Sequence, residues 1–127
     1  MKKIGNIGED FACSFLTDNG YQIIARNYLR SWGEIDIVSK STDGTLVFVE
    51  VKTMRHNPSL TPEDNLTATK LDKLRRTCRA FCAANPDLVN ERTGWRIDLI
   101  AITLPSGDGY LTEYNKNVQI YHYENIS

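Results

Sequence analysis

The sequence of 127 residues has no long apolar run, few cysteines and almost no excess charge, and each absence excludes a class of protein. No segment approaches the roughly 18 consecutive apolar residues of a membrane-spanning helix, so no membrane association is expected. The first residues are basic, but no apolar segment follows them, so no signal peptide is expected either. A net charge of −1 is also a poor fit to a generic basic nucleic-acid-binding protein.

Cysteine is scarce: the chain has three, Cys13, Cys78 and Cys82, and none of their spacings is CxxC. An odd number of cysteines within helical patterns indicates reduced thiols, and reduced thiols indicate a cytoplasmic protein. The alternative is a zinc site in which Cys78 and Cys82 join His56 or His122. Burial is the commoner role of an unpaired cysteine, which packs as a small hydrophobic residue.

Apolar spacing predicts one α/β domain over residues 1–127, with elements in the order αβββαββ. Hydrophobic residues make up 41% of the chain, enough for one core without disulfides. The second helix should cross over and return the chain to the same sheet, which gives a mixed five-stranded sheet flanked by helices. The expected helices are 4–19 and 68 to about 84, the second with Thr67 as its N-cap. The expected strands are 21–28, 34–40, 45–52, 95–104 and 118–123. A loop is expected at 56–65, a turn at 106–109 and packed aromatic residues at 121–123.

Two carboxylates and a lysine stand in apolar strands on either side of a predicted turn. Side chains alternate along a strand, so Glu50 and Lys52 share a face. A two-residue loop ending at Gly44 would turn Asp36 away from Glu50, whereas a three-residue loop ending there places the two carboxylates directly opposite each other. We predict the three-residue loop, because Gly44 tolerates the left-handed conformation that it needs.

Adjacent carboxylates in such apolar strands repel each other and are expensive to bury, and a bound cation offsets both costs. Mg²⁺, or Mn²⁺ in its place, takes about six oxygen ligands, of which Asp36 and Glu50 would supply two and the Val51 carbonyl a third. Lys52 would position the attacking water and stabilise developing negative charge. Glu9, on the first helix, would lean over the sheet and add a carboxylate. The alternative is a salt-bridged patch on a solvated sheet face.

Basic residues crowd the second predicted helix, where Asp72 alone opposes them. Such a cluster is either a solvated helix face or a surface that follows phosphates. The candidates for phosphate contacts are Lys70, Arg75, Arg76 and Arg79 on that helix, next to Lys73, and Arg26 and Arg55 outside it.

The lead acid Asp36 and the element Glu50-Val51-Lys52 resemble the catalytic motif of the PD-(D/E)xK, or restriction-endonuclease-like, nucleases. Ile35 stands here in place of the motif's proline. The resemblance implies a restriction-endonuclease-like fold and a nuclease-type site formed by Glu9, Asp36, Glu50 and Lys52.

A wider set of motifs is similar to the bacterial YraN family, which is distantly related to archaeal Holliday junction resolvases. That family often has an arginine two residues after the motif lysine, where this chain has Met54 followed by Arg55. The motifs of the wider set are Gly5-Asn6-Ile7-Gly8-Glu9, Arg26-Asn27, Gly33-Glu34-Ile35-Asp36, Phe48-Val49-Glu50-Val51-Lys52, Lys70 and Arg96-Ile97-Asp98.

Three functions are compatible with these residues. The motifs favour a metal-dependent endonuclease that hydrolyses phosphodiester bonds in DNA, branched or structured DNA included. The second is a nucleic-acid-binding module that keeps the fold without catalysis, and the third is an interaction protein with a structural charge patch. The choice between DNA and RNA and the number of metal ions stay open. A resolvase that cuts opposing strands needs two sites, which makes a homodimer attractive.

Overall fold

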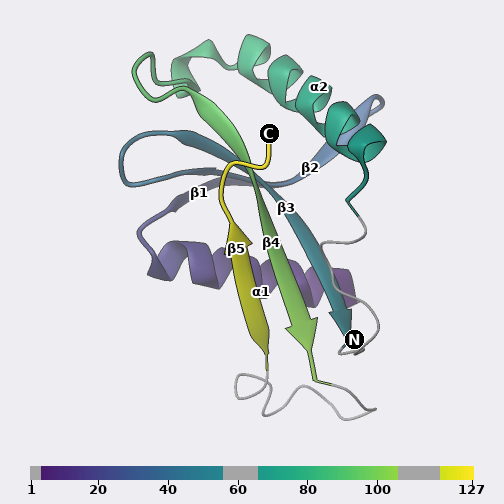
Figure 1. Ribbon diagram of the computed structural model, residues 1–127. Coiled ribbons are helices and arrows are strands. Elements are labelled where there is room, and N and C mark those ends of the chain that lie inside the picture. The colour runs from purple at the N-terminus through teal and green to yellow at the C-terminus, as the bar shows by residue number, and fades with distance from the viewer. Residues whose placement is uncertain (1–3, 56–65, 106–117) are drawn as a thin grey trace.

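The computed structural model describes residues 4–55, 66–105 and 118–127 (Figure 1). The predicted order αβββαββ is confirmed, with a short 3₁₀ helix, η2, added after the second helix. The loop expected at 56–65 and the turn expected at 106–109 lie outside the described residues. The elements are α1 (Ile4–Asp18), β1 (Gln22–Arg30), β2 (Gly33–Lys40), β3 (Leu46–Arg55), α2 (Ala68–Ala84), η2 (Pro86–Leu88), β4 (Trp95–Leu104) and β5 (Gln119–Tyr123).

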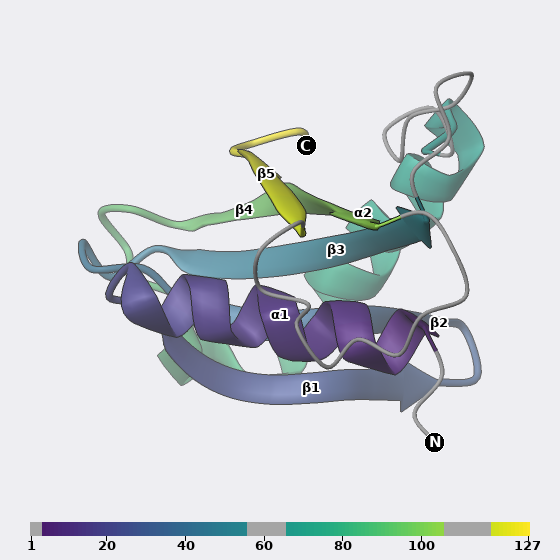
Figure 2. The ribbon, with the colours of Figure 1, turned by 90° about the horizontal axis from the view of Figure 1, so that it is seen from below.

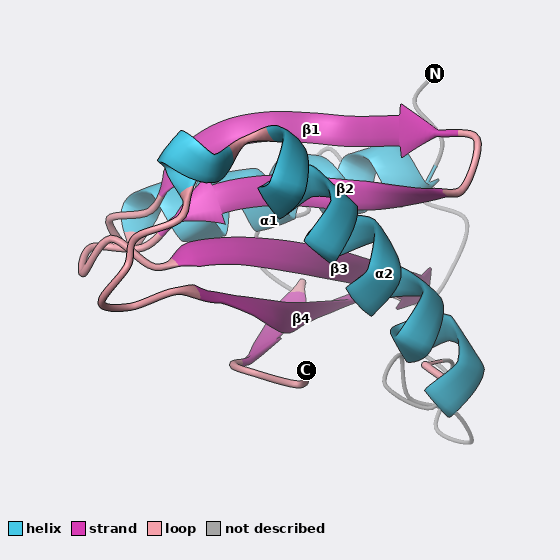
Figure 3. Ribbon diagram, turned by 90° about the horizontal axis from the view of Figure 1, so that it is seen from above, coloured by secondary structure: helices cyan, strands magenta, loops and turns pink. Residues whose placement is uncertain are grey.

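The five strands form one mixed sheet in the order β1-β2-β3-β4-β5. Strands β3 and β4 are parallel, and the other neighbours are antiparallel. Helix α2 makes the crossover between the parallel strands, as expected for a connection of this kind. Figures 2 and 3 show that α1 covers one face of the sheet and α2 the other. The α/β, restriction-endonuclease-like class predicted from the sequence is thereby confirmed.

Each face of the sheet has its own hydrophobic core. The alternation along β3 divides the two, since Val47 and Val49 pack on the α1 side while Leu46 and Phe48 pack on the α2 side. Helix α2 buries Leu74, Cys78 and Phe81 against its side of the sheet. Because side chains alternate along a strand, Glu50 and Lys52, which follow Phe48 by two and four residues, lie on the same α2 side of the sheet.

A backbone irregularity in β1 changes which face its side chains reach. Asn27 has a left-handed φ of 52°. Arg26, just before it, reaches α1 and donates to the carboxylate of Asp10, whereas Tyr28, just after it, stacks edge-on against Phe81 of α2. In a regular strand, residues 26 and 28 would share a face. This irregularity lies beside the part of β2 that carries the candidate acid.

The helices show no membrane-crossing character: within the described ranges, neither is both long enough and apolar enough to span a bilayer. The predicted N-cap of α2 is confirmed, because the Thr67 side chain accepts a hydrogen bond from the Lys70 N–H. This bond satisfies one of the free N–H groups of the first helical turn.

Gly8 allows the start of α1 to lie directly on β3. A Cβ atom built on Gly8 would overlap Thr53 Oγ1 and lie 2.8 Å from the Thr53 Cβ. We expect Gly8→Ala to lower the free energy of unfolding by about 1–3 kcal/mol, because the helix must move away from the strand. Alanine alone would raise helix stability by about 0.5–1 kcal/mol over glycine, so the steric effect must reverse that sign.

Urea unfolding of Gly8→Ala beside Ser14→Ala measures the steric effect. Ser14 is exposed on the same helix, so its replacement reports helix propensity alone. A Gly8→Ala variant at least as stable as the wild type would show that the contact between Gly8 and the Thr53 side chain is not tight.

Candidate active site

The β2–β3 hairpin has the predicted three-residue loop, Thr42-Asp43-Gly44. The Ser41 N–H donates to the Thr45 carbonyl over 2.9 Å and closes the loop, and Gly44 takes the expected left-handed φ of 90°. The strand register continues this pairing, with Lys40 opposite Leu46 and further pairs down to Ile37 opposite Val49. The predicted register is therefore confirmed.

Asp36 occupies the place where β2 and β3 separate. The ladder ends at Ile37 and Val49, so the N–H of Val51 no longer meets the Ile35 carbonyl that the register would bring to it. The Asp36 Oδ2 accepts that N–H instead, over 2.8 Å. The prediction of a plain cross-strand pair with Glu50 is thus corrected: Asp36 lies between the strands, in the gap that their separation leaves.

The change of face in β2 explains how Asp36 reaches this gap. Ile35 packs in the core beneath α2, whereas Ile37 packs in the core beneath α1. In a regular strand these two side chains would share a face. The backbone therefore turns at Asp36, and its carboxylate points along the sheet toward β3.

Glu50 is held against Asp36 in a poorly solvated position. Burial, a hydrogen bond with Asp36 and the negative charge of Asp36 together raise the pKa of Glu50 to about 8, and the charge of Lys52 opposes this rise. The Lys52 Nζ lies 3.9 Å from the Glu50 Oε1. The three residues predicted to converge are thus brought together.

These donors fit a divalent cation. Two adjacent carboxylates share one proton, and a cation in its place would neutralise both. The Val51 carbonyl points to the same side of β3 as its N–H, which faces Asp36. Among the described residues, however, no group of three or more acidic, histidine or cysteine side chains converges. Asp36, Glu50 and the Val51 carbonyl would therefore need water and phosphate oxygens to complete the shell.

Glu9 approaches the same acid from α1. Its pKa is raised, first by burial and then by the charge of Asp36, while Arg26 and a hydrogen bond with Asn27 oppose the rise. Its Oε1 is buried and has no hydrogen-bond partner among the described residues; the Arg26 guanidinium is 3.8 Å away. An orphaned buried carboxylate oxygen near Asp36 is the expected state of a group that lacks its cation or proton.

A cavity of about 490 Å³ opens beside Glu50 and Lys52, between the β1–β2 hairpin, β3 and the first half of α2. Figure 3 shows the β1–β2 turn and the start of α2 at the same end of the sheet. The charged residues that line it are Arg30, Glu34, Glu50, Lys52, Lys70 and Lys73. Four of the six are basic, so the cavity attracts anions and is large enough for a nucleotide-sized group.

A close backbone contact joins the hairpin to α2 at the wall of this cavity. Gly33 lies so near α2 that a Cβ on it would overlap the Thr77 Oγ1. The Thr77 hydroxyl is itself fixed, because it donates to the Lys73 carbonyl over 3.0 Å. The absence of a side chain at Gly33 therefore determines how closely the hairpin approaches the helix.

The basic residues of α2 divide between two sides of the helix. Lys70 and Lys73 both line the cavity. Arg79 follows Lys70 by nine residues, or two and a half turns, and so points away from the cavity. Arg75 lies 3.9 Å from Asp72. Arg75, Arg76 and Arg79 are not among the residues that line the cavity, so a role for them in phosphate binding stays a prediction.

The two predicted basic residues outside α2 also lie away from the cavity. Arg26 donates to Asp10 of α1 over 2.9 Å, and Arg55, at the end of β3, donates to the Pro105 carbonyl over 3.3 Å. Both contacts hold secondary-structure elements together. A role for either residue in phosphate binding stays a prediction.

Three charged residues of the cavity were missing from the predicted site: Arg30, Glu34 and Lys73. Glu34 precedes Asp36 by two residues, and this spacing in β2 could have indicated it. Lys73 follows Lys70 by one helical turn, which is the signal that separates it from Arg75 and Arg79. Arg30 carried no signal, because its place depends on how the hairpin packs on α2.

The zinc alternative finds no support in the described residues. All three cysteines are unpaired, and Cys78 and Cys82 pack in the core beneath α2, where burial raises the pKa of both thiols. His122 lies elsewhere and contacts Asp98. His56 lies outside the described residues.

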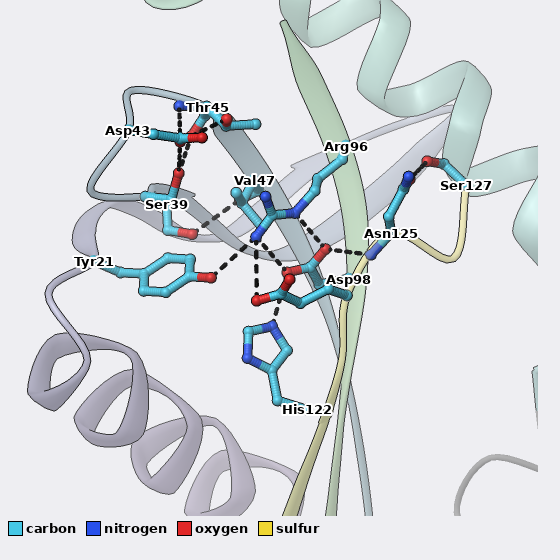
Figure 4. Close-up of polar contacts among 12 residues, drawn as sticks. Tyr21, Ser39, Asp43, Thr45, Val47, Arg96, Asp98, His122, Asn125 and Ser127 are labelled. Atoms are coloured by element: carbon cyan, nitrogen blue, oxygen red, sulfur yellow. Dashed lines mark hydrogen bonds and ion pairs between the residues drawn. The ribbon is translucent and has the colours of Figure 1, made fainter. Parts of the chain in front are cut away.

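A second polar cluster lies on the α1 face of the sheet (Figure 4). Asp98 is fully buried and contacts Arg96 Nε at 3.0 Å, His122 Nε2 at 2.7 Å and the Asn125 N–H at 2.8 Å. Arg96 also donates to the Tyr21 hydroxyl over 3.0 Å. The cluster fastens the C-terminal segment to β4. Packing was expected for the aromatic residues of β5. It is confirmed for His122, whose ring lies edge-on to those of Phe15 and Tyr21, and corrected for Tyr121 and Tyr123, which are exposed.

The raised pKa of Glu50 predicts a pH-dependent response to metal. A group with a raised folded pKa contributes stability below its unfolded value, near 4.5, and loses it as pH rises through about 8. Mn²⁺ must displace this proton at pH 6 but not at pH 9. We therefore expect Mn²⁺ to raise the melting temperature by several degrees at pH 9 and by less at pH 6.

Glu50→Gln is the matched control for that melting experiment. Glutamine keeps the shape of the side chain and removes its titration, so both the pH dependence and the metal response should become smaller. Equal Mn²⁺ shifts at both pH values, or equal shifts in the variant and the wild type, would place the metal elsewhere.

Comparison with known sequences gives a consistent family assignment. A sequence profile of the "Uncharacterised protein family UPF0102" matches residues 8–102, from α1 to β4. A UPF0102 protein of Roseiflexus castenholzii is 41% identical over 102 residues, 80% of each chain. That of Symbiobacterium thermophilum is 40% identical, and the match covers 87% of this chain and 89% of the relative. That of Dictyoglomus turgidum is 35% identical, and the match covers 91% of this chain and 96% of the relative.

Proposed function

The chain belongs to the uncharacterised protein family UPF0102, and we propose that it is a metal-dependent endonuclease that hydrolyses phosphodiester bonds in DNA. The observation that carries the proposal is the cavity in which Glu50 and Lys52 stand opposite Lys70 and Lys73, with Asp36 behind Glu50. Paired carboxylates, a lysine and an anion-attracting wall are the parts that phosphodiester hydrolysis needs.

Asp36, Glu50 and the Val51 carbonyl would hold Mg²⁺ or Mn²⁺. Such a cation, when bound, polarises the phosphoryl oxygen and lowers the pKa of a water molecule. Lys52 positions the water and stabilises negative charge in the transition state from its place 3.9 Å from Glu50. Arg30, Lys70 and Lys73 hold the phosphates, and Glu9 supports Asp36 from α1.

DNA is the substrate class that the nuclease-like motif favours. We propose that Asp36 and Glu50-Val51-Lys52 act as a PD-(D/E)xK site and that the protein is related to junction resolvases. The proposed substrates include branched or structured DNA. The cationic side of the cavity supports phosphate binding without choosing a sequence.

One observation favours a second candidate, a nucleic-acid-binding module without catalysis. Glu50 shares a hydrogen bond with Asp36 and has a pKa of about 8, so at neutral pH the metal-free site has lost part of its negative charge. A less negative site accepts a phosphate without a cation. In this case the fold and the basic lining would act in binding alone.

A cleavage assay separates the two candidates. Purified protein is incubated with supercoiled plasmid and with a four-way DNA junction, in Mn²⁺ and in EDTA, beside Glu50→Gln. Cleavage that needs both the metal and Glu50 is the expected result. Binding of either substrate without cleavage, by protein whose melting temperature responds to Mn²⁺, would leave the binding module as the function.

A further inference from the structure

The tip of the β1–β2 hairpin exposes an aromatic side chain that the proposed site does not use. Arg30 pairs with Gly33 across the hairpin, so Trp32 stands in the two-residue turn, and 54% of its surface is exposed. Two-residue turns favour small polar residues and glycine. About half of a large apolar ring is left in water. Neither the turn nor the core therefore explains this tryptophan.

The residues on both sides of Trp32 belong to the wall of the cavity. Leu29, Arg30, Ser31 and Gly33 all line it, and the Leu29 side chain is 67% exposed. The hairpin tip thus stands at the mouth of a cavity that also contains Glu50 and Lys52. A ligand that fills the cavity and extends beyond it on this side would reach the hairpin tip that carries Trp32.

Arg30 fixes a positive charge at the wall of the cavity, two residues before Trp32. Its guanidinium carbon lies 4.1 Å from the centre of the Tyr28 ring, and its Nη1 donates to the Leu29 carbonyl over 2.8 Å. The side chain is therefore held in place before any ligand binds. A cation–π contact of this kind keeps the charge available to a phosphate while restricting its position.

We propose that Trp32 is a stacking platform for an unpaired nucleobase whose neighbouring phosphates lie in the cavity. This inference rests on the proposed function, since it takes the cavity as the place of the phosphodiester backbone. A cationic groove beside an exposed aromatic ring is the arrangement that binds single-stranded nucleic acid. Bases of a continuous duplex are stacked on one another and offer no free face. The tip therefore favours strands with unpaired bases next to the bound phosphate.

Binding in EDTA tests the platform without cleavage. Wild type, Trp32→Ala, Trp32→Phe and Tyr121→Ala are titrated with labelled oligothymidylate and with a blunt duplex of equal length, and fluorescence anisotropy is read. Tyr121 is 49% exposed on β5, at the other edge of the sheet, and so controls for loss of an exposed aromatic ring. Tryptophan emission is recorded in parallel.

Trp32→Ala should weaken oligothymidylate binding about 5- to 150-fold and leave duplex binding within about 2-fold. Trp32→Phe should retain most of the affinity, because phenylalanine keeps a ring. Tyr121→Ala should resemble the wild type. Oligothymidylate should also quench the wild-type emission and leave that of Trp32→Phe unchanged, since the remaining Trp95 packs against Phe48, with ring centroids 5.6 Å apart.

The inference is overturned if Trp32→Ala binds oligothymidylate as the wild type does, or if the wild type does not bind it. It is also overturned if Trp32→Ala converts a dimer into a monomer in gel filtration, which would assign the tip to a second copy of the chain. Wild type that cleaves a gapped duplex and a continuous duplex alike, without dependence on Trp32, keeps the nuclease and rejects the platform. Binding through Trp32 without cleavage of any DNA rejects the nuclease and keeps the platform.

Discussion

Lys52→Met should reduce the rate of metal-dependent DNA cleavage by about 10²- to 10³-fold and leave DNA affinity within a few-fold. Methionine keeps most of the length of the side chain but removes the charge that stands 3.9 Å from Glu50. The loss should appear in kcat, because the ammonium group acts on the reacting phosphate in the transition state. Single-turnover cleavage at saturating protein separates this from a defect in binding.

The same substitution should shift the pH profile. The charge of Lys52 holds the pKa of Glu50 down against the effects of burial and of Asp36. Without it the pKa of Glu50 rises further, so residual cleavage and the Mn²⁺ effect on melting should need a higher pH. A variant with low activity but an unshifted profile would show that Lys52 acts on substrate alone.

Lys40→Met is the matched control for this lysine. Lys40 lies in β2 opposite Leu46, at the far end of the hairpin from the site. Its replacement should leave the rate and the pH profile unchanged. Equal loss of activity in Lys40→Met and Lys52→Met, with normal melting temperatures, would refute a specific role for Lys52.

The fold followed closely from local patterns in the sequence. The crossover helix made β3 and β4 parallel neighbours, and Gly44 determined the hairpin register through its left-handed conformation. Both features depend on residues close together in the chain, and their physical rules are strong. The convergence of Asp36, Glu50 and Lys52 followed from that register.

The remaining details of the site depend on packing between distant segments, which sequence periodicity does not contain. The turn of β2 at Asp36 accompanies the left-handed Asn27 in the neighbouring strand. Asparagine tolerates that conformation better than most residues, but nothing in the strand pattern around position 27 indicates that it is adopted there. The rotation of α2 about its axis decides that Lys73 lines the cavity and Arg79 does not. That rotation is set by which side chains the sheet accepts, so the spacing alone shows that Lys70 and Lys73 share a side of the helix but not that this side faces the cavity.

The Asp98 cluster was visible in the sequence only as a short motif, Arg96-Ile97-Asp98. Its partners His122 and Asn125 come from the end of the chain, and Tyr21 lies just before β1. Residues this far apart meet only after β5 has joined the sheet. The cluster therefore forms only in the completed fold, which is why the sequence pattern did not indicate it.

Asp98→Asn should lower the free energy of unfolding by about 3–5 kcal/mol, because it leaves the Arg96 guanidinium without its buried counter-charge. For a domain of this size the melting temperature should fall by about 10–20 °C. The amide nitrogen of asparagine would also face the Arg96 Nη2, which is itself a donor and now stands 3.3 Å from the Asp98 Oδ2. Thermal and urea unfolding of the variant beside the wild type measure the effect.

The contribution of Asp98 to the free energy of unfolding should grow as pH rises, whereas that of Glu50 falls as pH rises. Burial alone would raise the pKa of Asp98, but hydrogen bonds from His122, Arg96 and Asn125 outweigh it and lower the pKa below 3.8. The stability from Asp98 is therefore present above pH 3.8 and is lost as pH falls through the lower folded value.

Asp72→Asn, at an exposed carboxylate 3.9 Å from Arg75, should change stability by no more than about 0.5 kcal/mol. If Asp98→Asn changes the free energy of unfolding as little as this surface control, the cluster determines where β5 lies but contributes little to stability.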